Sequence, residues 1–286
     1  MSRGNPARSP VTPPGPPPLP LRRVALLGGD PGDGHPFSVP AVRSLQRAPL
    51  ALSVPVTFFV GENGSGKSTL LEGMAIAAGL PAAGASDLPR DPTLAAARRL
   101  AGALRLDWSS RSGRGCFLRA EDVFGFARRM DDTRADLERE RRAILDDPDL
   151  GERARGFALL PYARELHALR ERYGDGADAR SHGEAFLRLL QQRLAGTGRG
   201  LVLLDEPEAP LSPARQLALL ALLIDAARAG TQAVIATHSP ILMALPGAEI
   251  LVFGGEGIRP ARWEETEHVA ITRQFLNDPA GFLRRL

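Results

Sequence analysis

The chain contains little cysteine and little lysine, two residue types that often carry chemistry. Cys116 is its single cysteine, which excludes an internal disulfide and a cysteine-based zinc site and argues against a secreted protein. Lys67 is its single lysine, so every other basic residue among the 36 is an arginine. A composition that favours arginine so strongly makes the one lysine a candidate for a role that a planar guanidinium group does not fill.

Long apolar runs and a large net charge are absent as well. No apolar run approaches the roughly 18 to 20 residues that cross a bilayer, and the N-terminus has no apolar signal-peptide segment. We therefore expect a cytoplasmic protein without a membrane span. The formal charge of the 286 residues is only +3, so the composition permits contact with nucleic acid without supporting it. This length accommodates one large α/β domain or two smaller ones.

A phosphate-binding loop is the most specific motif in the sequence. The pattern G-x-x-x-x-G-K-[ST] is matched without a deviation, and with the threonine that follows it comprises Gly61, Glu62, Asn63, Gly64, Ser65, Gly66, Lys67, Ser68 and Thr69. Its glycines let the backbone turn so that several N–H groups face a phosphate. In such a loop the lysine reaches the β- and γ-phosphates of ATP, and the hydroxyl after it ligates Mg²⁺. We therefore predict ATP and Mg²⁺ as cofactors, with Ser68 as a metal ligand.

The residues around this loop have the character of a strand before it and a helix after it. Residues 56–60 are β-branched and aromatic, which is typical of a buried strand, and residues 69–78 have a helical pattern. The loop would then lie at a helix N-terminus, where anion binding is favoured. A compact ammonium group fits between phosphate oxygens, which agrees with the choice of the lone Lys67 here.

Two acids at the end of an apolar strand predict the metal-binding and hydrolytic side of the site. Residues 200–206 end in Asp205 and Glu206, at a position where a carboxylate can organise Mg²⁺. We expect Asp205 to hold Mg²⁺ through water and Glu206 to orient or deprotonate the attacking water. The next strand, residues 232–236, leads to His238, a candidate for sensing the γ-phosphate. The alternatives are that the two acids only open a loop and that the histidine is structural.

The order of the remaining elements indicates an α/β fold with a mostly parallel central sheet, an N-terminal β region and a helical insert. Residues 1–22 form a proline-rich tail that we expect to be disordered. Phe37 is a candidate for stacking on adenine, and a core position is the alternative. Residues 104–108 and 116–119 have the pattern of a strand and a returning strand.

The insert is expected over residues 121–180 as a helical subdomain. Its charged part, residues 131–146, suits an exposed helix with i,i+4 pairs. We expect this stretch to be too short for a heptad arm of several repeats.

Four segments, in their order along the chain, resemble the motifs of ATP-binding-cassette (ABC) ATPases. They are the phosphate loop, residues 180–184, residues 201–212 and residues 236–240. More narrowly, the chain resembles the stand-alone "AAA family" ATPases of bacteria, which have a cassette-type head and no membrane domain. The resemblance implies a P-loop, ABC-type ATPase domain over residues 23–286.

The resemblance also implies a mechanism with two copies of the chain. Two heads would pair head-to-tail around two ATP molecules, so that the phosphate loop of one faces Ser181 and Gly183 of the other. Ser181 would cap a helix from Gly183 to Arg193 and direct its N-terminus at the γ-phosphate across the interface. Glu206 would activate water and His238 would contact the γ-phosphate. The expected assembly is an ATP-dependent homodimer that acts on an unknown protein partner.

The chain departs from the cassette pattern at three places. His182 stands where the signature motif usually has glycine, and Ser212 stands where the loop after the two acids usually ends in aspartate. The usual glutamine between the phosphate loop and the signature is missing, and the matching region offers Arg119 and Glu121 instead. Glu121 is therefore a candidate metal ligand, whereas arginine cannot ligate a cation.

Two alternative functions of other classes stay open. In the first, the chain is the ATP-binding subunit of a membrane transporter; the missing glutamine argues mildly against this. In the second, it is a DNA-associated repair-type ATPase; the absence of an expected long coiled coil argues against this. Glu206 and His238 disfavour a nucleotide-binding module without turnover and a kinase, because they place water and not an acceptor hydroxyl.

Overall fold

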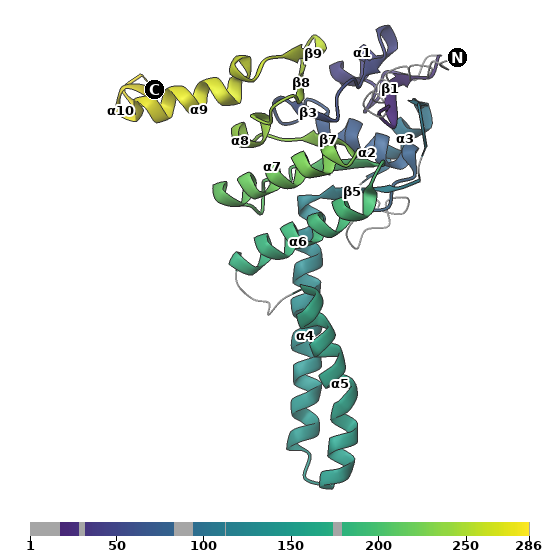
Figure 1. Cartoon of the computed structure of the whole chain (residues 1–286), viewed down its shortest axis with the longest axis vertical. Helices are drawn as coiled ribbons and strands as arrows, with labels where there is room; N and C mark the ends of the chain where they lie inside the picture. Colours follow the sequence, from purple (N-terminus) through teal and green to yellow (C-terminus); the bar gives the residue numbers. More distant parts are fainter. Residues whose placement is uncertain (1–17, 29–31, 83–93, 112, 174–178, 286) are drawn as a thin grey trace, which may run out of the picture.

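The computed structural model describes residues 18–28, 32–82, 94–111, 113–173 and 179–285, with the backbone alone for residues 121–131, 172–173 and 179–182. Its centre is a six-stranded sheet in the order β5-β6-β7-β3-β8-β9 (Figure 1). All neighbouring strands are parallel except β8 and β9, which form an antiparallel hairpin. The strands are β3 (Val56–Val60), β5 (Gly115–Arg119), β6 (Leu201–Asp205), β7 (Gln232–Ala236), β8 (Glu249–Gly254) and β9 (Gly257–Ala261).

The inner strands of this sheet are covered on both faces, which explains their continuous apolar sequences. Every residue of β3, β6 and β7 is buried. Side chains alternate between the two faces of a strand, so Phe59 packs into one apolar cluster while Phe58 packs into the other.

Helices cover both faces of the sheet. One cluster contains side chains of α1 (Pro40–Arg47), α2 (Lys67–Ala78) and α3 (Ala95–Ala103), and the other contains side chains of α6 (Ala179–Thr197), α7 (Pro213–Arg228) and α8 (Pro240–Met243). The mixed sheet between two helical layers is the α/β, P-loop NTPase arrangement that the order of the elements predicts.

A small antiparallel sheet lies against α1 and α2, in the order β2-β1-β4. It is formed by β1 (Leu21–Leu26), β2 (Leu50–Ala51) and β4 (Leu104–Trp108). The buried amide of Gln232, at the start of β7, donates to the Leu21 carbonyl at 2.9 Å and accepts from the Leu21 N–H at 2.8 Å. One side chain of the central sheet therefore fixes the position of the N-terminal strand.

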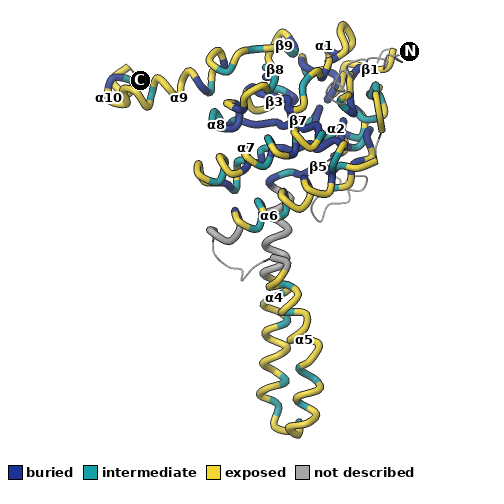
Figure 2. Tube along the Cα trace, viewed as in Figure 1, coloured by how far each residue is buried: buried dark blue, intermediate teal, exposed yellow. Residues whose placement is uncertain are grey.

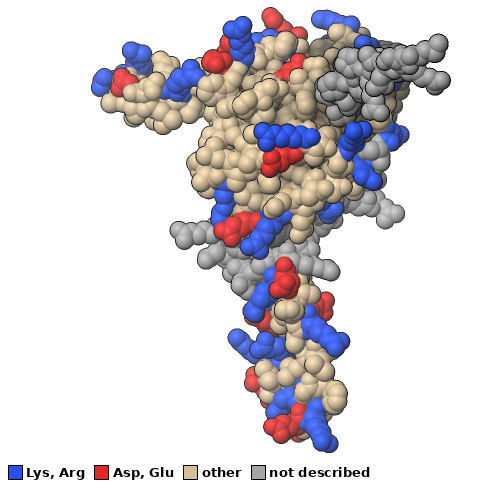
Figure 3. Space-filling model, viewed as in Figure 1, with Lys and Arg blue, Asp and Glu red and all other residues tan. Residues whose placement is uncertain are grey.

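Two long helices project from the head as a hairpin (Figure 1). They are α4 (Ala120–Asp146), of 27 residues, and α5 (Glu152–Tyr173), of 22 residues. At 1.5 Å per residue, α4 is about 40 Å long. Most of its described side chains are exposed (Figure 2), and basic and acidic groups are mixed along it (Figure 3).

The charged stretch, which we expected to be too short for a heptad arm of several repeats, is part of a helix of 27 residues. Residues 121–130 and 131–146 belong to one helix, because no proline and only one glycine, Gly125, interrupts them. Pro161 lies inside α5, which begins at Glu152. The two helices contact each other along their length, and in the described part of the chain no element of the head covers their outer halves (Figure 1).

Other predictions about individual elements have mixed outcomes. The strand before the phosphate loop and the strands that lead to Asp205 and His238 are confirmed. The idea that residues 116–119 return along residues 104–108 is wrong, because β4 belongs to the small sheet while β5 pairs with β6 in the central one. The order expected from residue 23 begins two residues earlier, at Leu21, and residues 1–17 of the expected tail lie outside the described residues.

The chain ends in η2 (Trp263–Glu265), α9 (Glu267–Asn277) and α10 (Pro279–Leu283), which extend away from the head (Figure 1). Among the described residues, no helix combines the length and the apolar character needed to cross a membrane.

Candidate functional site

The phosphate loop connects the end of β3 to the start of α2, and two of its glycines are required by close contacts. Gly61 has φ of 149°, and a Cβ atom there would lie 2.4 Å from the carbonyl oxygen of Phe253. Gly66 has φ of 98°, and its Cβ would lie 2.7 Å from Val39. A larger residue at either position would displace backbone or core atoms, so the loop conformation depends on glycine.

Lys67 lies in the first turn of α2 and is 4 % exposed. Its Nζ donates to the carbonyl oxygens of Gly61 and Glu62 at 2.6 and 2.8 Å. Burial lowers the pKa of Lys67, and the carboxylates of Glu206 and Asp205 oppose that shift. The amine is therefore held across the loop, at the place where phosphate oxygens are expected.

Ser68 and Asp205 are brought together from positions 137 residues apart, and the Ser68 hydroxyl donates to Asp205 Oδ1 at 3.0 Å. Burial raises the pKa of Asp205 to about 7, while the Ser68 hydrogen bond opposes the shift. A buried carboxylate beside a hydroxyl, with one lysine nearby, gains from a further cation.

Glu206 follows β6 in a strained conformation. Its φ is 48°, and it is the one non-glycine residue with positive φ among the described residues. Its N–H donates to the Ala236 carbonyl at 2.9 Å, and its carboxylate lies 3.6 Å from His238 Nε2 with 47 % of the side chain exposed. The neighbouring strand β7 thus holds the Glu206 backbone, while the Glu206 carboxylate stays partly open to solvent. Strained residues of this kind are often found at functional sites.

His238 follows β7, the strand next to β6, and two groups fix its position. Its N–H donates to Glu208 Oε1 at 2.7 Å, and its Nδ1 lies 2.9 Å from Nε2 of His268. Burial lowers the pKa of His238 to about 4, and the charge of Lys67 adds to the shift. The imidazole is therefore neutral near pH 7, and its Nε2 is buried without a hydrogen-bond partner among the described residues.

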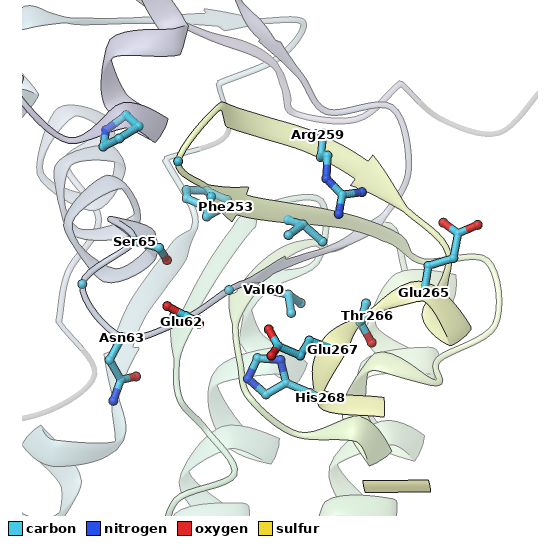
Figure 4. Close-up of a pocket in the computed structure, with 16 residues that line it drawn as sticks. Val60, Glu62, Asn63, Ser65, Phe253, Arg259, Glu265, Thr266, Glu267 and His268 are labelled. Carbon is cyan, nitrogen blue, oxygen red and sulfur yellow. The ribbon is translucent and has the colours of Figure 1, made fainter. Parts of the chain in front are cut away.

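A cavity of about 600 Å³ lies between the phosphate loop, the β8–β9 hairpin and the start of α9 (Figure 4). Glu62, Asn63 and Ser65 line it from the loop, and Arg259 and His268 line it from the opposite side. The Ser65 hydroxyl is buried, and no described residue forms a hydrogen bond with it. Charged side chains of both signs, Glu62 and Arg259 among them, stand on this wall and offer polar contacts to a ligand.

The residues present fit Mg²⁺ bound together with a nucleotide. In the part of the chain that the structure describes, no three His, Cys, Asp or Glu side chains form a metal-binding group. Mg²⁺ beside phosphates, however, takes only one or two protein ligands and completes its shell with phosphate oxygens and water. Ser68 and Asp205 supply that pair of oxygen ligands. The buried Nε2 of His238 and hydroxyl of Ser65 are polar groups that a phosphate would satisfy.

The structure does not bring the predicted signature residues to the phosphate loop of the same chain. The atoms nearest to Gly183 belong to Pro210 and Arg215, and a Cβ at Gly183 would lie 2.8 Å from the Pro210 carbonyl. The predicted cap is wrong, because α6 begins at Ala179 and places Ser181 within its first turn. The side chain of Ser181 lies outside the described residues.

The region of the missing glutamine holds an ion pair. Arg119, at the end of β5, pairs with Glu72 of α2, and both side chains are largely buried, at 14 % and 12 % exposed. Glu121 follows in the first turn of α4, and its side chain lies outside the described residues, so its expected role as a metal ligand stays a prediction. Phe37 is 6 % exposed within the core, and its ring is not available for stacking on adenine.

Two further residues belong to the site, Glu208 and His268, to which no role was assigned from the sequence. Burial raises the pKa of Glu208, whose carboxylate accepts from the backbone N–H of His238. It is the third acid in four residues at the end of β6, which was a usable signal. His268 lies 30 residues beyond its partner His238 in the sequence, and a local sequence pattern does not predict a contact over that separation.

Family models match two segments of the chain. Residues 39–96 match a model described as "AAA domain", and residues 183–244 match one described as "AAA domain, putative AbiEii toxin, Type IV TA system". The first segment contains the phosphate loop, and the second contains Gly183, Asp205, Glu206 and His238. Among curated proteins, none matches the chain.

Solved structures that match have low sequence identity. A nucleotide-free ATP-binding cassette from an ABC transporter is 16% identical, with 91% of this chain and 96% of that chain covered and a TM-score of 0.44. The protein cbiO1 from Clostridium perfringens, part of the ABC transporter complex cbiONQ, is 17% identical, with coverage of 94% and 100% and a TM-score of 0.44.

Proposed function

We propose that the chain is an ATPase of the AAA/ABC type, since two of its segments match AAA-domain models. In this proposal it hydrolyses Mg²⁺-bound ATP in an ATP-sandwiched homodimer that acts as a switch on a protein partner. One observation carries the proposal: the carboxyl ends of three adjacent strands, β3, β7 and β6, bring Lys67, His238 and the Ser68–Asp205 pair to one edge of the sheet. At that edge of a parallel sheet, ligands bind beyond the strand ends.

Each residue of the edge has a separate task in the proposed reaction. Lys67 and the loop N–H groups bind the phosphates, while Ser68 and Asp205 hold Mg²⁺. Bound Mg²⁺ would neutralise charge on the β- and γ-phosphate oxygens. Asp205 is buried and already bonded to Ser68, so its carboxylate is oriented before the metal binds.

Glu206 and His238 act on the γ-phosphate. Glu206 accepts a proton from water, and the water oxygen bonds to the γ-phosphorus as the bond between that phosphorus and the bridging oxygen breaks, which releases ADP. Neutral His238 donates from Nε2 to a γ-phosphate oxygen, where negative charge is concentrated. The 3.6 Å between His238 Nε2 and the Glu206 carboxylate places both groups around one small volume.

The exposure of Glu206 supports closure by a second copy. Nearly half of this side chain, 47 %, is open to solvent in the single chain, whereas hydrolysis of ATP is controlled best in a site that admits one water. Gly183 lies near the N-terminal end of α6 and away from the loop of its own chain. In a head-to-tail pairing, both Gly183 and Ser181 would lie over the phosphates that the partner copy binds.

We assign contact with the partner protein to the α4–α5 hairpin, which we regard as a helical subdomain. The hairpin projects from the head (Figure 1), and Phe157, near the start of α5, is 73 % exposed. A transporter subunit is the second candidate, because the motif order of the chain resembles that of ABC ATPases in general. The buried Arg119–Glu72 pair at the position of the missing glutamine argues for the switch, because an arginine committed to an ion pair is not free to follow a membrane partner.

The test is the mass in solution of the Glu206→Gln variant, measured by light scattering with and without Mg-ATP. We expect a mass near 30.6 kDa without nucleotide and about twice that mass with it, because the trapped ATP bridges two heads. The matched control is Glu256→Gln, which removes an exposed acid from the β8–β9 turn. This variant should hydrolyse the added Mg-ATP and then show the mass of a monomer. A Glu206→Gln monomer in both conditions would overturn the dimeric switch.

A further inference from the structure

The histidine beside the reactive edge has a partner of its own on α9. His268 is the second residue of that helix, and its Nε2 lies 2.9 Å from Nδ1 of His238. The ring centroids are 5.0 Å apart and the rings are tilted by 59°. This contact joins the start of α9 to the loop that follows β7.

The segment that carries His268 is anchored to the segment that carries His238. Trp263 of η2 donates from its indole N–H to the Pro240 carbonyl at 3.0 Å, two residues after His238. Thr266 is 2 % exposed and donates to the Trp263 carbonyl at 2.8 Å. Val269 is also 2 % exposed, whereas the rest of α9 leaves the head. These contacts fix the start of α9, and with it His268, against the loop after β7.

The contact couples the tautomers of the two imidazole rings. A hydrogen bond between two neutral imidazole rings needs one N–H donor and one lone pair. Burial lowers the pKa of both histidines, and the charge of Lys67 adds to each shift. If His268 donates from Nε2, Nδ1 of His238 accepts, and the proton of His238 is on Nε2. That atom is buried, has no partner among the described residues and faces Glu206.

We propose that His268 is a positioning residue for ATP hydrolysis, which holds His238 in the tautomer and orientation that direct its Nε2–H at the γ-phosphate. The inference rests on the proposed role of His238. The inference also gives α9 a role, because the orientation of His238 then depends on the position of His268 at the start of this helix. Removing the partner that orients a metal-ligating histidine through its second nitrogen commonly costs about 10- to 100-fold in metal affinity or activity, and we expect a loss of the same order for His238.

The first test compares three variants in steady-state ATP hydrolysis. His268→Ala should lower kcat by about 10- to 100-fold with KM for ATP changed by less than about threefold. His268→Gln places an amide N–H near the same position and should restore most of kcat. Gln274→Ala, at an exposed residue of the same helix, is the matched control and should behave as the wild type. Equal losses in His268→Ala and His268→Gln, or no loss in either, would overturn the proposal.

The second test does not depend on turnover. The ¹⁵N shifts of the histidine rings, assigned with His238→Asn, report the tautomer of His238. The wild type and His268→Gln should show the proton on Nε2, and His268→Ala should show a mixture of tautomers. A His238 tautomer that is the same in all three proteins contradicts the positioning role. Full hydrolysis by His238→Asn would instead refute the proposed role of His238, so the two failures are distinguishable.

Discussion

Replacing Glu206 by glycine should make the nucleotide-free protein more stable while it abolishes hydrolysis. Glu206 adopts φ of 48°, in the left-handed region. A residue with a Cβ atom pays about 1–2 kcal/mol there, because the Cβ approaches the following carbonyl oxygen. The backbone keeps this conformation because the Glu206 N–H donates to the Ala236 carbonyl of β7. Glycine would retain that bond without the steric cost.

The expected gain follows from two opposing terms. Relief of the left-handed conformation contributes about 1–2 kcal/mol, and the greater freedom of glycine in the unfolded chain costs about 0.5–1 kcal/mol. The contact with His238 adds little, since that imidazole is neutral near pH 7 and the Glu206 side chain is 47 % exposed. At their midpoints, about 1.5 and about 0.75 kcal/mol, the two terms leave a free energy of unfolding that is higher by about 0.75 kcal/mol.

Urea denaturation of the nucleotide-free protein measures this difference. With a slope of about 2 kcal/mol per molar urea, the midpoint of Glu206→Gly should lie about 0.3–0.5 M above that of Glu206→Ala. Alanine is the matched control, because it removes the same carboxylate and keeps the Cβ atom. A glycine variant with a midpoint at or below that of the alanine variant would refute the claim that the fold holds Glu206 under strain.

Three further predictions concern the surroundings of the site. Phe37→Leu should lower the free energy of unfolding by about 1 kcal/mol and leave the Kd for ATP unchanged in calorimetry, since Phe37 is a core residue; a tenfold weaker Kd would restore the adenine-stacking interpretation. Arg119→Leu should cost about 2 kcal/mol in urea denaturation because it leaves the Glu72 carboxylate largely buried, and adding Glu72→Leu should recover most of it; a double variant no better than the single one would contradict this. The free energy of unfolding should fall as the pH drops from about 6.5 to about 4, because the folded pKa of His238, about 4, lies below the unfolded value of 6.5 and the unfolded chain binds the extra proton in this range. His238→Asn should lose that part of the pH dependence. An unchanged pH profile in this variant would refute the lowered pKa of His238.

Local sequence was sufficient for the strands that meet at the site. Each of β3, β6 and β7 is a short run of apolar residues followed by loop residues that carry the chemistry. Because both faces of these strands are buried, almost every position must be apolar, and the pattern is unambiguous. The Asp205 and His238 strands, which follow each other along the chain, are also neighbours in the sheet, as consecutive strands often are.

Sequence was insufficient where a contact depends on distant packing. The short apolar run of β5 can pair with any strand, and its partner β6 lies more than 80 residues away in sequence. The buried position of Phe37 depends on packing with α2 and α3, which lie about 30 to 65 residues further along the sequence. The contact between His268 and His238 is set by the Trp263–Pro240 hydrogen bond that docks the C-terminal segment, and no spacing in the sequence encodes it.

The most direct test of the central claim, that the edge formed by Asp205, Glu206 and His238 hydrolyses ATP, is phosphate release by the wild type and by Glu206→Gln under single-turnover conditions. ATP affinity is measured in parallel by calorimetry. The account predicts Mg²⁺-dependent release by the wild type, and release at least about 100-fold slower by the variant with ATP affinity within a few fold. Release at the wild-type rate by a Glu206→Gln protein that binds ATP normally would contradict the account.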